Sequence, residues 1–222
     1  MISEKYNCIF VHIPKTGGSS IENMIWDWEE RTAGILWGGF ITEYFNKYQA
    51  GGLQHLLATQ IRHEIGEDRY SRAFTFSMVR NPFDRIVSQF FYMSKREDLR
   101  TYISMQADDC FQRYLDLITK RKHVQWERQH RFVHDHHGNC LVDRVMRFED
   151  FDREVSKLME ALKIPFTHIR HDNQSTQNKQ GIYDKASYEQ VADMFREDFE
   201  LLDYAIVPFE HSRYACEACI SQ

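Results

Sequence analysis

The sequence predicts an α/β protein built on a parallel sheet, and three observations favour this fold class. Residues 7–13 (NCIFVHI) and 73–79 (AFTFSMV) are short apolar runs rich in β-branched and aromatic side chains, a pattern typical of buried parallel strands. Each run is followed by turn residues, and then by a segment whose apolar side chains recur at helical spacing. Two strands that each lead into a helix indicate a parallel α/β sheet.

The length and composition of the chain predict one globular domain over residues 1–222, with a core over about residues 7–209 and a short C-terminal tail. The chain has 222 residues and a hydrophobic fraction of 42%, with 16 Phe and 11 Tyr, which excludes a disordered protein. There is no internal repeat, low-complexity tract or obvious linker.

The charge and hydropathy patterns exclude several kinds of partner. A net charge of −5 and a pI near 6.1 do not suit binding to nucleic acid or to an anionic membrane over a broad surface. No apolar stretch reads as a signal peptide or a membrane span. These features predict a cytoplasmic location, which includes a peripheral site at a membrane. They do not indicate an oligomeric state.

The cysteines and histidines do not predict a metal site. The five cysteines are scattered, which fits a reducing compartment, and only Cys216 and Cys219 form a C-x-x-C pair. That pair lacks two further ligands at a suitable spacing. Three histidines near a turn, His134, His136 and His137, are expected to be exposed polar residues.

The first strand-to-helix connection, PKTGGSS at residues 14–20, has the residues of a phosphate-binding loop. Gly17 and Gly18 let backbone N–H groups approach an anion, the following helix N-terminus adds a partial positive charge, and Lys15 adds a full one. Three residues add hydroxyl donors, namely Thr16, Ser19 and Ser20. The loop is not a Walker A motif, because Lys15 precedes the glycines, so the lysine can neutralise charge on a leaving oxygen.

The second connection places Arg80 at the end of a strand and Ser88 two turns into the next helix, so that an arginine fork and a hydroxyl can bind one phosphate. Asn81 is the expected N-cap of this helix, with Pro82 at its first position. Asp84 and Arg85 suit either this site or a solvated helix face.

Weaker patterns predict the remaining elements. The first helix is expected to place Trp28 on the same face as Ile21, Met24 and Ile25. The other expectations are a short helix at 42–47, a helix from His55 to a C-cap at Gly66, a helix at 107–119, a hairpin or a pair of short strands around HHGN at 136–139, and helices at 151–162 and 187–202, the last with a capping box of Ser187 and Gln190.

Taken together, PKTGGSS and the Arg80/Ser88 pair resemble the donor-binding motifs of sulfotransferases that use 3′-phosphoadenosine 5′-phosphosulfate (PAPS). QHLLATQI, FTFSMVRNPFDRIVS, the W-x-x-Q of Trp126 and Gln129, VDRVMRFEDF and HDNQS follow the order seen in the carbohydrate branch, which includes heparan sulfate 2-O-sulfotransferase-like and bacterial enzymes. The resemblance implies a P-loop-like three-layer fold with a central parallel sheet flanked by helices.

The resemblance also implies a reaction: in-line transfer of a sulfuryl group from PAPS to a hydroxyl of a carbohydrate or glycolipid, with 3′-phosphoadenosine 5′-phosphate (PAP) as product and no metal. Lys15 would stabilise the leaving phosphate, and Arg80 with Ser88 would bind the 3′-phosphate. Two residues of a polar loop, Asn173 and Ser175, would contact the same end of the donor.

A general base must take the acceptor proton, and the sequence favours His55, which resembles the catalytic histidine that precedes the 3′-phosphate strand in this branch. The rival bases are His12, His63, Glu22 and Glu43.

Two alternative functions stay open. A small-molecule kinase with a phosphate loop would need magnesium ligands, and the strand at 73–79 ends in Arg80 rather than in an aspartate. A catalytically inactive relative could bind nucleotide or glycan instead.

Overall fold

The computed structural model of the chain describes residues 1–38, 52–169 and 181–215. These residues form two compact units, and each is described by itself. Unit 1 comprises residues 1–80 and 129–174, and unit 2 comprises residues 81–128 and 175–222.

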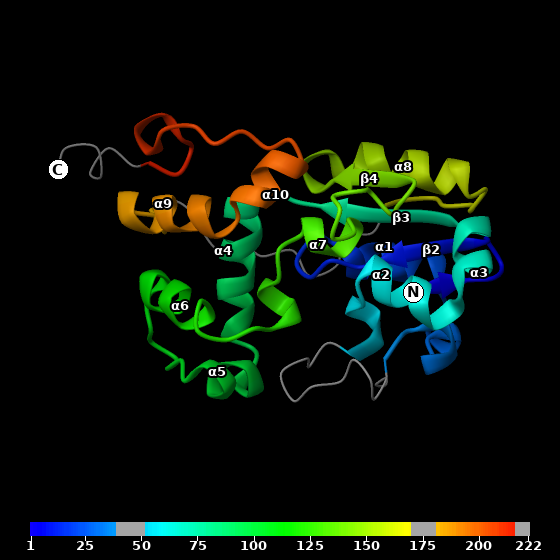
Figure 1. Cartoon of the computed structure of the whole chain (residues 1–222), viewed down its shortest axis with the longest axis horizontal. Coiled ribbons are helices and arrows are strands. Elements are labelled where there is room, and N and C mark those ends of the chain that lie inside the picture. The colour runs from blue at the N-terminus through cyan, green and yellow to red at the C-terminus, as the bar shows by residue number, and fades with distance from the viewer. Residues whose placement is uncertain (39–51, 170–180, 216–222) are drawn as a thin grey trace. The chain divides into compact units, whose positions relative to one another are not determined.

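Unit 1 is built on a four-stranded sheet with the order β1-β2-β3-β4 (Figure 1). Its strands are β1 (Ile2–Ser3), β2 (Cys8–Val11), β3 (Phe74–Val79) and β4 (Arg144–Arg147). β1 is antiparallel to β2, whereas β2, β3 and β4 are parallel to one another. The predicted fold class is therefore confirmed, since the chain has a mostly parallel sheet flanked by helices.

One face of this sheet is covered by two helices, α1 (Gly18–Ile25) and α8 (Phe151–Ala161). Alternate strand residues point to the same face, so Phe10, Phe76 and Met146 share one core with these helices. The Phe10 and Phe76 rings, which are opposite each other in the β2–β3 register, stack with centroids 5.1 Å apart. This packing fixes the carboxyl end of β2, where the predicted phosphate-binding loop (residues 14–20) begins.

The segments after α1 differ from the predicted helices. Trp28 is not on a face of the first helix; it starts the short turn η1 (Trp28–Glu30) and is 69% exposed. Another turn, η2 (Ala33–Ile35), follows. The helix expected from His55 begins later, because residues 52–55 form the separate turn η3 (Gly52–His55) and α2 is Ala58–Ile65. Gly66 caps α2 with φ 81°, as predicted, and α3 (Glu67–Arg72) leads into β3.

Of the hairpin or pair of short strands predicted around residues 136–139, only the second strand, β4, is confirmed. Residues before the turn form the helix α7 (His130–Val133), and β4 pairs with β3 in parallel. Only a single antiparallel bridge, His134 to Cys140, remains of the hairpin. The turn itself is closed by the Asp135 carboxylate, which accepts hydrogen bonds from the backbone N–H groups of His137 and Asn139. The short turn η5 (Phe148–Asp150) then joins β4 to α8.

Unit 2 is helical. Its elements are α4 (Pro82–Met93), α5 (Glu97–Ile103), α6 (Phe111–Ile118), η4 (Val124–Trp126), α9 (Lys185–Met194), α10 (Arg196–Leu201) and η6 (Phe209–His211). α9 contacts both α4 and α6, and the Phe83 and Tyr188 rings stack with centroids 4.1 Å apart. The Asn81 side chain accepts a hydrogen bond from the Phe83 N–H at 3.0 Å, which confirms the predicted N-cap of α4.

Two sequence expectations in unit 2 are corrected. Arg85 is 2% exposed rather than part of a solvated face, and its Nη1 donates to the Glu127 carbonyl at 2.9 Å. The helix predicted at 187–202 is divided into α9 and α10, and the N-cap of α9 is Asp184, whose carboxylate accepts from the Ser187 N–H at 2.7 Å. Ser187 is therefore the third helical residue of α9, not its cap.

Some expectations lie outside the described residues, namely the short helix at 42–47 and the Cys216/Cys219 pair. Among the helices that the structure describes, none combines the length and the apolar character needed to cross a bilayer.

Candidate functional site

The loop between β2 and α1 turns through two residues in the left-handed region, Lys15 with φ 69° and Gly17 with φ 83°. The Thr16 hydroxyl donates to the Ile13 carbonyl at 2.8 Å, and Thr16 is fully buried, so this hydroxyl closes the loop from inside. α1 starts at Gly18, and the first N–H groups of a helix have no partner within it. The loop therefore places Lys15 shortly before the N-terminus of α1.

Both glycines of the loop are required by close contacts. A Cβ on Gly17 would lie 2.9 Å from ring atoms of Phe148 and of Phe151, and one on Gly18 would lie 2.2 Å from Cδ2 and Nε2 of the His12 ring. The His12 imidazole therefore lies directly against the first residue of α1. Only glycine lets these rings and the loop backbone approach so closely.

Gly18→Ala is expected to destabilise unit 1 and weaken donor binding together. The added methyl group would have to displace the buried His12 ring, and overpacking of this kind costs about 1–3 kcal/mol. Thermal unfolding and PAP titration would measure the two effects. Gly34→Ala is a suitable control, because neither Gly18 nor Gly34 has positive φ, and an added Cβ on Gly34 would meet only Thr32 Oγ1, at 3.6 Å. Equal effects of the two substitutions would show that the His12 contact does not set the requirement for glycine.

Arg80, which follows β3, lies against the same loop. Its Nη1 donates to the Lys15 carbonyl at 3.3 Å, and its guanidinium lies 4.3 Å from the centroid of the Phe148 ring. Its backbone is clamped by the Gln129 amide, which accepts from the Arg80 N–H at 2.9 Å and donates to the Arg80 carbonyl at 2.7 Å. Lys15 and Arg80, 65 positions apart in sequence, thus bring two positive charges to one loop.

Behind the loop lies a buried pair of His12 and Glu22. His12 Nδ1 lies 2.5 Å from Glu22 Oε1, and Trp37 Nε1 donates to the other carboxylate oxygen at 3.2 Å. Burial disfavours the charged carboxylate, but the charge and hydrogen bond of His12, with smaller contributions from Trp37 and His55, outweigh it and lower the pKa of Glu22 to about 2. Glu22 is therefore ionised at neutral pH, and His12 donates to it from Nδ1.

His55, at the end of η3, is 5% exposed and lies beside this pair. Its Nδ1 is 3.0 Å from the His12 carbonyl, and the two imidazole rings meet edge to face with centroids 4.6 Å apart. A carbonyl oxygen only accepts hydrogen bonds, so His55 Nδ1 carries a hydrogen and the neutral ring has its lone pair at Nε2. This is the tautomer that a general base at Nε2 requires.

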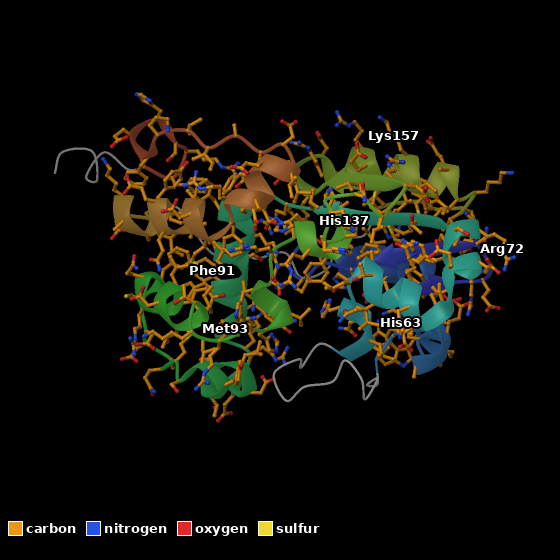
Figure 2. The ribbon with its side chains drawn as sticks, viewed as in Figure 1. His63, Arg72, Phe91, Met93, His137 and Lys157 are labelled. Atoms are coloured by element: carbon orange, nitrogen blue, oxygen red, sulfur yellow. The ribbon has the colours of Figure 1, made fainter. Side chains whose placement is uncertain are left out.

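The structure separates the rival bases. His12, Glu22 and His55 come together behind the loop, whereas His63 is an exposed residue of α2 rather than a neighbour of His55 on one helix (Figure 2). Glu43 lies outside the described residues. His136 and His137 are exposed at their turn, as predicted, and His134 is half-buried. In residues 1–38, 52–169 and 181–215 there is no group of three or more His, Cys, Asp or Glu residues that could hold a metal ion.

The other predicted donor residues are distributed between the units. Ser19 is half-buried and Ser20 buried in the first turn of α1, in unit 1. Ser88 is a half-buried residue of α4, in unit 2. Asn173 and Ser175 lie outside the described residues.

Sequence patterns missed three contributors to the site. Gln129, noticed only as part of a W-x-x-Q motif, holds the Arg80 backbone; Phe148 packs on the guanidinium; and Trp37 binds Glu22. The Gln129 contact spans 49 positions, so no local periodicity could reveal it.

The fold and this loop define an α/β protein with a glycine-containing loop between a strand and a helix, an arginine that contacts that loop, and buried histidines beside it. The particular class follows from comparison: the model of the Sulfotransferase family matches residues 1–205, so the chain belongs to that family, whose general activity is sulfuryl transfer. No curated protein and no solved structure matches the chain.

Proposed function

We propose that this chain transfers a sulfuryl group from PAPS to a hydroxyl of a carbohydrate or glycolipid acceptor. The observation that carries the proposal is the loop after β2, where the Arg80 guanidinium donates to the carbonyl of Lys15, shortly before α1 begins at Gly18. The residues present fit such a donor, because the loop offers cations, helix N–H groups and glycines that permit close approach of an anion.

In the proposed step, the acceptor oxygen forms a bond to sulfur while the bond from sulfur to the 5′-phosphate oxygen breaks. The electron pair of the broken bond stays on that phosphate oxygen, and PAP leaves. Lys15 neutralises the charge that grows there, which is the main contribution a protein makes to transfers of this type. Arg80 binds the 3′-phosphate, and Gly17, Gly18, Ser19 and Ser20, together with the Thr16 backbone N–H, bind the 5′ end.

His55 takes the acceptor proton at Nε2. Its support is the hydrogen bond from Nδ1 to the His12 carbonyl, which leaves the lone pair of the neutral ring at Nε2. The carbohydrate branch is supported by the order of the motifs from QHLLATQI to HDNQS. A kinase is less well supported, because β3 leads into Arg80 where a magnesium-binding aspartate would be needed.

The proposal is tested by incubating the purified chain with sulfur-labelled PAPS and a panel of glycans and glycolipids, and by titrating PAP. We expect labelled product and saturable PAP binding. Arg80→Ala should weaken PAP binding by about 10- to 100-fold, the range for a charge-assisted hydrogen bond to a phosphate.

Arg69→Ala is the matched control, because Arg69 is also a unit 1 arginine but lies on α3 and pairs with Glu4. PAP binding unchanged by Arg80→Ala would remove Arg80 from the donor site. No PAP binding together with magnesium-dependent phosphorylation from ATP would replace the proposal with the kinase alternative.

A further inference from the structure

The Glu22 carboxylate has no place in the proposed step, although it is buried close to both histidines of the site. It is 5% exposed, and its two oxygens contact His12 and Trp37 at 2.5 and 3.2 Å. A charge buried to this extent is costly unless it is compensated, so its position behind the donor loop needs an explanation beyond packing.

The contacts connect Glu22 to His55 in two steps. Glu22 holds the His12 imidazole through Nδ1, and His12 contacts His55 both through its ring, with centroids 4.6 Å apart, and through its carbonyl, at 3.0 Å from His55 Nδ1. When His55 takes a proton it becomes a cation in a region with little water. A nearby negative charge stabilises that cation, and the effect is strong because burial reduces solvent screening.

We propose that Glu22 is a positioning residue that holds His12 against His55 and stabilises His55 in its protonated form during transfer. The inference rests on the proposed role of His55 as the general base. In this proposal α1 has two roles. Its N-terminus binds the anion, and Glu22 on the same helix supplies the negative charge that stabilises protonated His55.

Other charged groups lie close to His12, Glu22 and His55 and contribute to the electrostatic environment of this cluster. Glu22 interacts with His12 from the end of β2, with His55 from η3, and with the buried α-amino group of Met1, which donates to the Phe10 carbonyl at 2.7 Å. Burial lowers the pKa of that amino group to about 5, whereas Glu22 and Cys8 raise it. The loop adds the cations Lys15 and Arg80. Glu22 is thus a carboxylate that faces several basic groups.

The test is a histidine NMR titration of the full chain in wild type and Glu22→Gln, with the His55 ring signals assigned by their loss in His55→Gln. Removing the negative charge should lower the midpoint of the His55 titration by about 0.5 to 1 pH unit. The fall of kcat/KM on the acid side should move to lower pH by the same amount. The plateau value of kcat/KM at higher pH should also be lower than in the wild type.

Two variants separate charge from packing. Glu22→Asp keeps the charge, so the midpoint of the His55 titration should stay close to that of the wild type. Trp37→Phe also keeps the charge but removes one hydrogen bond to Glu22, so it should change that midpoint by less than about 0.2 pH units. Glu154, which pairs with Arg144 in the same unit, is a control carboxylate. Glu154→Gln should leave the midpoint of the His55 titration unchanged. An unchanged midpoint in Glu22→Gln, or an equal shift in Trp37→Phe, would overturn the inference.

The NMR titration needs neither PAPS nor an acceptor. A His55 shift in a protein that transfers no sulfuryl group would refute the proposed function and leave the coupling standing. Sulfuryl transfer with no shift would refute the coupling and leave the proposed function standing.

Discussion

Lys15→Ala is expected to lower the rate of sulfuryl transfer by about 10²- to 10³-fold, the loss seen when one charge-stabilising donor is removed from an active site. The reason is that charge grows on the 5′-phosphate oxygen only as the bond to sulfur breaks, so the transition state loses more than the bound donor does. Single-turnover rates with labelled PAPS would measure the loss in transfer. PAP titration should show a smaller loss of affinity, of about 10-fold.

The chain offers a matched control in Lys163→Ala. Lys163 is in the same unit and also has a left-handed backbone, with φ 55° against 69° for Lys15, but it is exposed after α8. Both substitutions replace a lysine by alanine at positive φ, so their backbone effects should be similar. Lys163→Ala should keep transfer within about 2-fold of wild type. Equal losses in the two variants would show that backbone conformation, not the Lys15 charge, supports activity.

The parts of the fold that could be predicted are those set by local pattern. The β2 and β3 strands, the Asn81 cap of α4 and the Gly66 cap of α2 each follow from a few adjacent residues. The hairpin expected near residue 138 failed because β4 pairs with β3, a parallel partner about 68 positions earlier, and Asp143 extends this pairing through its contacts with Thr75. Such tertiary pairing overrides the local turn signal.

The same division holds for the candidate site. The order of Lys15 and two glycines between a strand and a helix could be read as an anion loop, because the required residues are contiguous. The positions of His12 and His55 could not, since they meet across 43 positions through a carbonyl contact and a ring contact. Arg85 shows a related limit of sequence-based prediction. A charged residue near the start of a helix is expected to face solvent, and only the structure shows that Arg85 donates to the Glu127 carbonyl.

His55→Gln is expected to lower turnover by about 10²- to 10⁴-fold, the usual contribution of a general base, while PAP affinity stays within about 2-fold. Glutamine can replace the Nδ1 donor to the His12 carbonyl but has no group that takes a proton near neutral pH. The measurements are kcat and kcat/KM over a range of pH, together with PAP titration. The acid limb of the wild-type kcat/KM profile should be absent from the variant.

Two further histidines make this prediction specific. His63→Gln, on the exposed surface of α2, should leave turnover unchanged, because that side chain lies outside the buried cluster. His12→Gln should lower turnover but keep an acid limb, since His12 acts on His55 rather than on the acceptor in this scheme. If instead His12→Gln loses the acid limb and His55→Gln keeps it, the base is His12. In that case the Glu22 carboxylate acts directly on the base, because it accepts the hydrogen of His12 Nδ1.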